Sequence, residues 1–564
     1  MLVGFTGYQA LKAKTALEAV AADFDTLRGQ LASGDEAGAR KSLAAAQSHA
    51  QDARSNTRGP GWWVSARIPQ IGPNVRAVRS VAVVADNLAA KVLPDVVSAS
   101  STLSPQRLKP VDGRIDLAPI RASAPSVERA ASRLAVESDR VRGIDVASLA
   151  PQIAAPVQQL QTKIADAAGL ADRASRAVRL LPDMLGDRGR RRYLFVFQNN
   201  AEIRATGGIP GSFALLTASN GELSLGRQDD SSTIASFPKP PTPITGPEKA
   251  LFGEAMGRFF QDVNFTPDFP RSALLVSRMY QQRTGRTVDG VVSVDPIALS
   301  HVLVGTGPVQ TVSGLTLTND NVVQLLLSDV YADIPDTTQQ NTFFNAVARD
   351  VFKAVSSGVG DPRAVLENIA TSASERRLLL WSSRADEQKL LAPTAVAGRL
   401  ETRATEAPQV GVYFNAAVPY KLDYYLDYEV SADSTRCVDG RQQLTVTADL
   451  SSRVPRNLRK LTQYVAPSVP QFKRGTIVTT LYFFAPVDGS VRTLRVDGEE
   501  QKPALQQLDG RPVFARTVIV KPGETTKVSV DVTAGRGQSG QPDLQVTPGV
   551  RSTGVGPVSA SACS

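Results

Sequence analysis

The spacing of apolar residues changes twice along this chain of 564 residues, and that change constrains the fold more than any single motif does. Over about the first 185 residues, apolar side chains recur every three or four positions, which is typical of one buried helical face. Examples are Leu17, Val20, Phe24, Leu27 and Leu31. A break at 33–35 places Asp35 to cap a following helix. We therefore expect an α-helical stalk or bundle over residues 1–188.

The second regime begins with a short apolar run of strand-forming residues at 193–197. Asn220 and Gly221 follow between two apolar segments, and this dipeptide is a strong signal for a β-hairpin. Further on, helical and strand patterns alternate, which is typical of a mixed α/β domain. The helical patterns cover 270–284 and 319–332, and the strand patterns cover 288–294 and 378–381. We expect a central α/β domain over residues 189–403.

The third regime consists of short segments in which apolar and polar residues alternate, with turn residues between them. These segments cover 424–430, 443–450, 476–484, 491–496 and 513–520. Their spacing predicts a β-sandwich over residues 404–535. The tail over 536–564 is rich in Gly, Pro and Ser, so we expect it to lie irregularly over the sandwich.

The chain contains two cysteines, Cys437 and Cys563, which are 126 positions apart. A disulfide between them would close a long loop and stabilise the fold by about 4–5 kcal/mol in the chain-entropy model. The alternative is two unrelated free thiols. We favour the disulfide, which requires an oxidising, extracytoplasmic compartment.

The formal net charge is +9, and basic residues concentrate in short runs at 187–192 and 453–460. Such runs are either solvated surface or sites of attraction to anionic lipid headgroups and phosphate-bearing polymers. No aromatic residues interleave with them in a nucleic-acid reading pattern, so we expect no nucleic-acid partner.

The chain has neither an apolar run of about 20 residues nor a signal peptide. Either it is cytosolic, or residues 1–5 are the last turn of an anchor upstream of Met1.

Several catalytic classes lack their residues here. No Gly-Lys dipeptide occurs, so a Walker A loop is absent from the sequence. The chain has two histidines, His49 and His301. A zinc site or a histidine-dependent triad would need more than these. We expect His301, within an apolar helical pattern, to be a packing residue.

The segment 198–208 is the most unusual part of the chain, because it combines amides, a carboxylate, a guanidinium and a glycine pair between two strands. Its candidate ligand-binding residues are Gln198, Asn200, Glu202, Arg204, Gly207 and Gly208. The glycines would free backbone N–H groups for an anion, and the arginine suits phosphate or carboxylate. The alternative is an internal Glu202–Arg204 pair in an amide network that shapes a loop.

A second polar segment, 261–271, places Asp262, Asn264 and Asp268 within seven residues and stiffens them with two prolines. Carboxylate and amide oxygens are ligands that Mg²⁺ prefers, so Asp262 and Asn264 are candidate ligands beside a phosphate. Asp268 precedes Pro270 and is better placed to cap a helix that begins there.

Four of these segments in order, 198–208, 262–270, 288–296 and 305–309, resemble the bacterial domain of unknown function 4012 family. The segments 31–35, 62–73 and 547–549 resemble it too, so the resemblance covers nearly the whole chain. It implies an envelope protein with one membrane helix just before the stalk.

The order of the central segments is also distantly similar to the LytR-CpsA-Psr phosphotransferases, which attach polyprenyl-pyrophosphate-linked glycopolymers to peptidoglycan. The similarity extends over 331–341, where Gln339, Gln340 and Asn341 match the amide part of that family's pattern. The paired arginines that grip the pyrophosphate in those enzymes are missing here. Either Arg204 serves that role alone, with Gln340 as a further ligand-binding residue, or the transferase activity is lost.

These observations leave three hypotheses. The leading one is a membrane-anchored envelope protein that binds a lipid-linked glycopolymer, with or without transferring it, and in which Asp262 and Arg204 would be catalytic residues and Mg²⁺ the cofactor. In the second, the protein is a non-catalytic envelope assembly scaffold. The third is a glycoside hydrolase that uses Glu202 and an aspartate, and it ranks last because an adjacent arginine lowers the pKa of a carboxyl.

Overall fold

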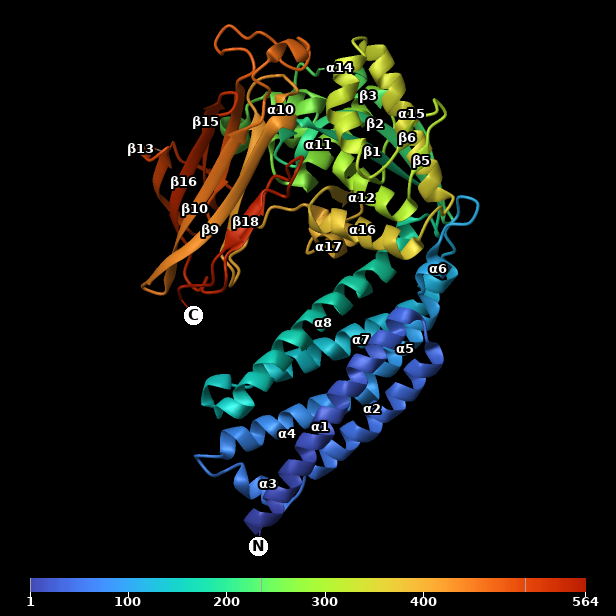
Figure 1. Ribbon diagram of the computed structural model, residues 1–564, viewed down its shortest axis with the longest axis vertical. Coiled ribbons are helices and arrows are strands. Elements are labelled where there is room, and N and C mark those ends of the chain that lie inside the picture. Colours follow the sequence, from blue (N-terminus) through green and yellow to red (C-terminus); the bar gives the residue numbers. More distant parts are fainter. Residues whose placement is uncertain (1, 235, 503, 564) are drawn as a thin grey trace. The chain divides into compact units, whose positions relative to one another are not determined.

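The computed structural model describes residues 2–234, 236–502 and 504–563, without the side chains of residues 2–7. The chain divides into two compact units (Figure 1). Unit 1 comprises residues 1–109 and 115–189, and unit 2 comprises residues 110–114 and 190–564. Met1, on which the expected anchor depends, lies outside the described residues. No helix in the described ranges is both long enough and apolar enough to cross a bilayer.

Unit 1 is a bundle of long antiparallel helices, as the helical repeat predicts. Asp35 caps α2 by accepting a hydrogen bond from the Gly38 N–H at 2.9 Å. The apolar stripe of α1 buries Val20 and Leu27 against the bundle. The helices are α1 (Leu2–Ser33), α2 (Glu36–Asn56), α3 (Pro60–Ser65), α4 (Gly72–Asn87), α5 (Leu93–Thr102), α6 (Pro105–Leu108), α7 (Ala118–Arg142) and α8 (Pro151–Met184).

The first part of unit 2 is a mixed five-stranded sheet in the order β3-β2-β1-β4-β7. β1 pairs with β4 in parallel, and the other neighbours are antiparallel. The β2–β3 hairpin turns at Asn220 and Gly221, both with positive φ, as that dipeptide predicts. The strands are β1 (Arg191–Arg204), β2 (Gly207–Ser219), β3 (Glu222–Asp230), β4 (Gly290–Val294) and β7 (Leu378–Ser382).

Helices pack around this sheet and complete the α/β part of unit 2. α11 lies against β4 and β7, while α12 contacts β1 and packs on α16. Asp268 caps α11 and Asp295 caps α12, each through a hydrogen bond to a backbone N–H. The longer helices are α11 (Phe269–Thr284), α12 (Pro296–Thr306), α15 (Thr337–Ser356) and α16 (Pro362–Ser374). Shorter ones are α9 (Gly246–Phe252), α10 (Ala255–Arg258), α13 (Val322–Gln324), α14 (Val330–Asp333) and α17 (Ala385–Leu391), and β5 (Val309–Gln310) pairs with β6 (Thr316–Leu317).

The second part of unit 2 is the expected β-sandwich, built from a six-stranded and a five-stranded sheet. The six-stranded sheet has the order β13-β12-β16-β10-β9-β18, and the five-stranded sheet β14-β15-β11-β8-β17. The strands are β8 (Gln409–Ala416), β9 (Leu426–Val438), β10 (Arg441–Ser452), β11 (Ile477–Phe484), β12 (Ser490–Val496), β13 (Glu499–Gln501), β14 (Gln506–Leu508), β15 (Arg511–Val520) and β16 (Thr525–Thr533), followed by β17 (Asp543–Val546) and β18 (Val555–Val558).

The C-terminal tail corrects one expectation, since it is not irregular throughout. β17 adds to β8 and β18 adds to β9, both in parallel. The prolines and glycines that predicted an irregular tail are tolerated because these are edge strands. Cys437 at the end of β9 and Cys563 form a disulfide with an S–S distance of 2.01 Å, which confirms that prediction.

The five-stranded sheet of the sandwich is covered on both faces. Phe414 and Phe483 point into the sandwich core with β9 and β10. Tyr413 and Phe484 belong to a second core, which also contains residues of β1, β2 and α11. The α/β part and the sandwich therefore share a continuous hydrophobic core within unit 2.

Candidate functional site

The polar segment 198–208, which we expected to be a loop joining two strands, is itself part of a β-hairpin. β1 continues through Arg204, and β2 begins at Gly207. Asn199 lies opposite Ile209 and Ile203 opposite Gly208, so residues 200–202 form a bulge without partners on β2. Buried partners from the sandwich and from neighbouring helices keep this polar stretch in strand conformation, and the sequence segment alone does not reveal them.

The glycine pair is explained by the close approach of backbone at this bulge. A Cβ at Gly208 would lie 2.3 Å from the carbonyl carbon of Asn199. Gly207 has a φ of 133°, which side-chain-bearing residues rarely adopt. The Gly208 N–H donates to the Gln198 side-chain oxygen at 2.8 Å. This N–H group is therefore used inside the protein and is not free for an anion.

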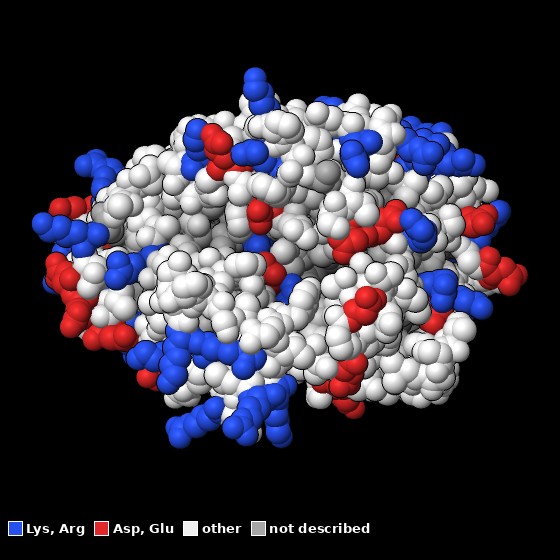
Figure 2. Space-filling view, turned by 90° about the horizontal axis from the view of Figure 1, so that it is seen from above, with Lys and Arg blue, Asp and Glu red and all other residues white. Residues whose placement is uncertain are grey.

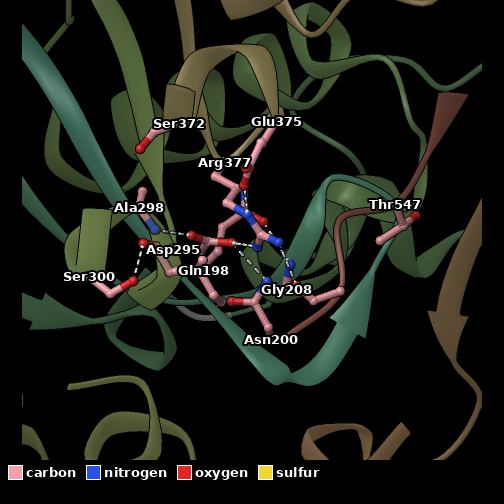
Figure 3. A network of polar contacts seen from close by, with 12 residues as sticks. Gln198, Asn200, Gly208, Asp295, Ala298, Ser300, Ser372, Glu375, Arg377 and Thr547 are labelled. Atoms are coloured by element: carbon pink, nitrogen blue, oxygen red, sulfur yellow. Dashed lines mark hydrogen bonds and ion pairs between the residues drawn. The ribbon is translucent and has the colours of Figure 1, made fainter. Parts of the chain in front are cut away.

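A first buried network joins the bulge to α12 and to the C-terminal tail (Figure 3). The Asn200 amide donates to Asp295 Oδ2 at 3.0 Å, and Arg377 Nη1 donates to the same oxygen at 3.0 Å. Arg377 also donates to the carbonyl oxygen of Gly549 at 2.8 Å. Gln198 Nε2 donates to Ser293 Oγ at 2.6 Å. The side-chain amides of Asn200 and Gln198 thus donate hydrogen bonds to buried groups of the protein itself.

A second network, which we call the charged cluster, comprises Glu202, Arg204, Asp262, Lys421 and Asp423. Arg204 Nη2 lies 2.8 Å from Glu202 Oε1 and 3.4 Å from Asp262 Oδ1. Lys421 Nζ lies 2.8 Å from the other oxygen of Glu202. Asp423 Oδ2 accepts a hydrogen bond from the Ile203 N–H at 2.9 Å. Arg204 is thus already neutralised by two carboxylates.

The charged cluster shifts the pKa of its carboxyls in different directions. Burial acts to raise the pKa of Glu202, but the positive charges of Lys421 and Arg204 outweigh it and lower that pKa. Burial raises the pKa of Asp262, although Arg204 opposes the shift. Burial also raises the pKa of Asp423, to about 7, although a backbone hydrogen bond opposes it. Asp423 therefore holds a proton over part of the neutral range.

Side chains of the sandwich form hydrogen bonds with backbone groups of the connection between β1 and β2. The Asn415 side-chain oxygen accepts from the Ala205 N–H at 2.9 Å, and Thr547 Oγ1 donates to the Ala205 carbonyl at 3.0 Å. The Asn264 amide donates to Gly208 O at 2.9 Å and to Thr206 Oγ1 at 2.8 Å. The whole region is a polar junction between the α/β sheet and the sandwich, and all of it lies inside unit 2.

Residues 188–331 match the family described as a protein of unknown function, DUF4012. The match confirms the resemblance read from 198–208, 262–270, 288–296 and 305–309, all of which lie in this range. No curated protein matches the chain. The distant similarity to the LytR-CpsA-Psr phosphotransferases stays a prediction.

The remaining predicted residues of the DUF4012 segment and its surroundings lie in separate local structures. Asp268 accepts from the Arg271 N–H as the cap of α11 and from the Leu400 N–H at 2.9 Å. Gln340, beyond the matched segment, is buried in α15 and donates to the carbonyl of Ile334 at 2.7 Å. Within the described part of the chain, neither residue forms a hydrogen bond to a member of the charged cluster.

Asp262 and Asn264 do not fit a magnesium site well. Mg²⁺ needs near-octahedral oxygen ligands and usually keeps several waters. Asp262 is bound to Arg204, and Asn264 is almost fully buried with its amide nitrogen directed at Thr206 and Gly208. Among the described residues, no group of three or more acidic, histidine or cysteine side chains could hold a metal ion.

His301, on α12, is partly buried and makes polar contacts with Ser372 at the α12–α16 interface and with Glu375. Its Nδ1 lies 3.1 Å from Ser372 Oγ and its Nε2 lies 3.9 Å from Glu375. Ser372 is almost fully buried, and its hydroxyl donates to the carbonyl of Asn368 at 2.9 Å. A buried hydroxyl that is bound in this way cannot reach a substrate as a nucleophile.

Sequence reasoning missed Lys421, Asp423, Asn415 and Arg377, which complete the two networks. Asp423 follows its partner Ile203 by 220 positions, and Asn415 follows Ala205 by 210. No spacing rule links residues so far apart. The available signal was the presence of charged residues, Lys421 and Asp423, between segments that otherwise alternate as strands.

Figure 2 shows one face of the molecule on which acidic and basic side chains lie next to each other within a hollow near the middle. Larger groups of Lys and Arg are at the margins of that face. Paired charges neutralise each other, so such a surface attracts a polyanion less than an unpaired basic patch does.

Proposed function

We propose that this protein is a non-catalytic scaffold for assembly in a bacterial cell envelope and that it works outside the cytoplasm. The carrying observation is that Arg204, the residue best suited to grip a pyrophosphate, is bound to Glu202 and Asp262. The segment around it joins the DUF4012 segment to the sandwich through buried hydrogen bonds. A rigid junction of this kind suits a protein that presents surfaces to partners.

The disulfide supports the extracytoplasmic setting, because such bonds persist in oxidising compartments and are rare in the cytosol. The resemblance to an envelope family favours the same setting. In this proposal the partners are envelope proteins and the cell-wall polymers that they assemble, and the protein is held at a membrane.

A second candidate is binding and transfer of a polyprenyl-pyrophosphate-linked glycopolymer. It is favoured by one observation, which is that Asp262 is the most exposed carboxylate of the charged cluster, with a side chain 20% accessible. In this candidate an incoming phosphate would displace Asp262 from Arg204. Displacement would cost an ion pair before any binding is gained, so we rank it second.

A glycoside hydrolase is the weakest candidate. The lowered pKa of Glu202, which Lys421 and Arg204 hold charged against the effect of burial, is the wrong direction for a general acid. Asp423 has a raised pKa, but its side chain is almost fully buried and so is not presented to a substrate.

The deciding experiment incubates the purified protein with a synthetic polyprenyl-pyrophosphate-linked oligosaccharide and peptidoglycan, with a LytR-CpsA-Psr enzyme as positive control. A scaffold gives no transferred glycan by mass spectrometry, with or without added Mg²⁺. Transfer by the wild type that is lost in Asp262→Asn would overturn the proposal in favour of the second candidate. Non-reducing peptide mapping of protein from its native host checks the setting, and free thiols at Cys437 and Cys563 would contradict it.

A further inference from the structure

One end of unit 1 exposes a group of large apolar side chains. Trp63, Val64, Ile68 and Ile71 are 56%, 52%, 39% and 44% accessible. They lie on α3 and on the segment that leads into α4, and we call them the Trp63 patch. Figure 1 shows α3 beside the beginning of α1, with which it is in contact. A cluster of exposed apolar residues in one place usually marks a binding surface.

The Trp63 patch is held in a defined conformation. Its neighbour Trp62 is only 2% accessible, so one of two adjacent tryptophans is buried in the bundle and the other faces outward. The Arg67 guanidinium stacks on the Trp63 ring, 3.3 Å from its centroid, and donates to the Trp63 carbonyl at 3.0 Å. Arg76 donates to the carbonyl of Ala66 at 2.7 Å. The exposed ring therefore lies on a short helix, and hydrogen bonds fix the segment that follows it.

The surroundings of the Trp63 patch are strongly basic. Residues 53–85 contain Arg54, Arg58, Arg67, Arg76 and Arg79 and no Asp or Glu. Within the described part of the chain, none of these five arginines forms an ion pair with a carboxylate. Burial lowers the pKa of Arg54, and the positive charges of Arg58, Arg79 and Arg140 lower it further against the opposing effect of Asp86. Arg58 and Arg79 therefore lie within electrostatic range of Arg54, while Arg67 and Arg76 donate to backbone carbonyls of the patch segment itself.

We propose that this end of unit 1 docks on an anionic lipid surface. Trp63, Val64, Ile68 and Ile71 would enter the boundary between headgroups and acyl chains, where tryptophan is favoured. The arginines around them would contact lipid phosphates. A soluble polyanion would satisfy the arginines alone and would leave four apolar side chains in water, so a bilayer fits the combined surface better.

The inference depends on the proposed envelope setting in one respect, which is that the lipid surface would be a cell membrane. Its chemistry is independent of the charged cluster and of any glycan. Binding to vesicles can therefore fail while the scaffold proposal stands, and a transferase result would leave vesicle binding unaffected.

The test is cosedimentation of the full chain with vesicles of phosphatidylcholine that contain about one quarter phosphatidylglycerol. The wild type should bind these and should bind phosphatidylcholine alone much more weakly. Neutralising two arginines in Arg58→Gln/Arg67→Gln should lower the partition coefficient by about 25-fold, since each charge near the surface is worth about fivefold. Trp63→Ser should weaken binding and should remove a blue shift of tryptophan emission on vesicle addition.

The matched control is Arg286→Gln/Arg536→Gln, which removes the same charge from exposed arginines of unit 2 outside the two basic runs and should leave binding unchanged. Circular dichroism checks that each variant keeps its helices. The proposal is overturned if the control variant loses as much binding as the Arg58/Arg67 variant. It is also overturned if the wild type does not bind the anionic vesicles. The same holds if Trp63→Ser binds them as tightly as the wild type does and soluble polyglutamate fully displaces the protein from them.

Discussion

At the scale of single residues, the charged cluster decides between a ligand site and a structural junction. Two positive side chains, Arg204 and Lys421, face two carboxylates, Glu202 and Asp262, and a third carboxyl at Asp423 is held partly protonated. The cluster is thus close to neutral overall. A buried set of charges in balance is stable as a set but sensitive to the loss of any one member.

The first prediction concerns that balance. Arg204→Ala should lower the free energy of unfolding of unit 2 by ~3–5 kcal/mol. The reason is that Asp262 loses its ion pair with Arg204, and Glu202 keeps only its ion pair with Lys421. Adding Glu202→Gln removes one negative charge and should recover most of that loss. Thermal melts and denaturant titrations of the single and double variants give the coupling energy.

The control for this prediction is Arg227→Ala, which breaks the exposed pair with Asp229. Such a pair is worth at most about 1 kcal/mol. If Arg204→Ala melts like the wild type, the arginine is not needed for the fold and the ligand interpretation returns.

The second prediction concerns Asp423, whose pKa is raised by burial from its ordinary value of 3.8 to about 7. The folded state binds the proton more tightly than the unfolded state, so the stability from this group is complete below pH 4. It is lost as the pH rises toward and through 7. Asp423→Asn mimics the protonated form and can still accept from the Ile203 N–H.

The melting temperature of Asp423→Asn relative to the wild type should therefore rise between pH 4 and pH 8. Taking the difference cancels the other titrating groups, including Glu202. A difference that stays flat over this range would mean that Asp423 is ionised in the folded protein.

At the scale of elements, local signals in the sequence were sufficient wherever the partners are close along the chain. The caps at Asp35 and Asp268 and the hairpin at Asn220–Gly221 depend on neighbours within three residues. The segment 198–208 resisted prediction because its partners come from β8, from residues near β9 and from the tail, which are 210, 220 and 342 positions away. Polar residues that looked like a loop are buried because the sandwich supplies their hydrogen bonds.

The β1–β2 bulge gives the third prediction. Gly208→Ala should destabilise unit 2 by roughly 1–3 kcal/mol, because its Cβ would lie 2.3 Å from the Asn199 carbonyl carbon and backbone must move. Gly246→Ala is the matched control at the start of α9, where a Cβ meets nothing within 4 Å. The control should be neutral or slightly stabilising. Equal melting temperatures for the two variants would contradict the close-packed bulge.

At the scale of the whole molecule, the two units have separate hydrophobic cores. Leu134 belongs to a core of α-helical residues in unit 1, whereas Leu275 belongs to the core that the α/β part and the sandwich share. A shared core couples the unfolding of the parts that build it. The sequence patterns suggested separate central and sandwich domains, but the covering of the five-stranded sheet on both faces makes one cooperative unit the expected behaviour of unit 2.

The last prediction is that calorimetry of the full chain resolves two unfolding transitions. Leu134→Ala should lower the midpoint of one transition and leave the other in place, with a cost of about 2–5 kcal/mol for a buried leucine. Leu275→Ala should lower only the other midpoint, and Arg204→Ala should move the same transition as Leu275→Ala because both residues lie in unit 2. Three transitions, with Arg204→Ala splitting the α/β part from the sandwich, would show that the polar junction and not the shared core couples them. A single transition moved by every variant would contradict the division into two units.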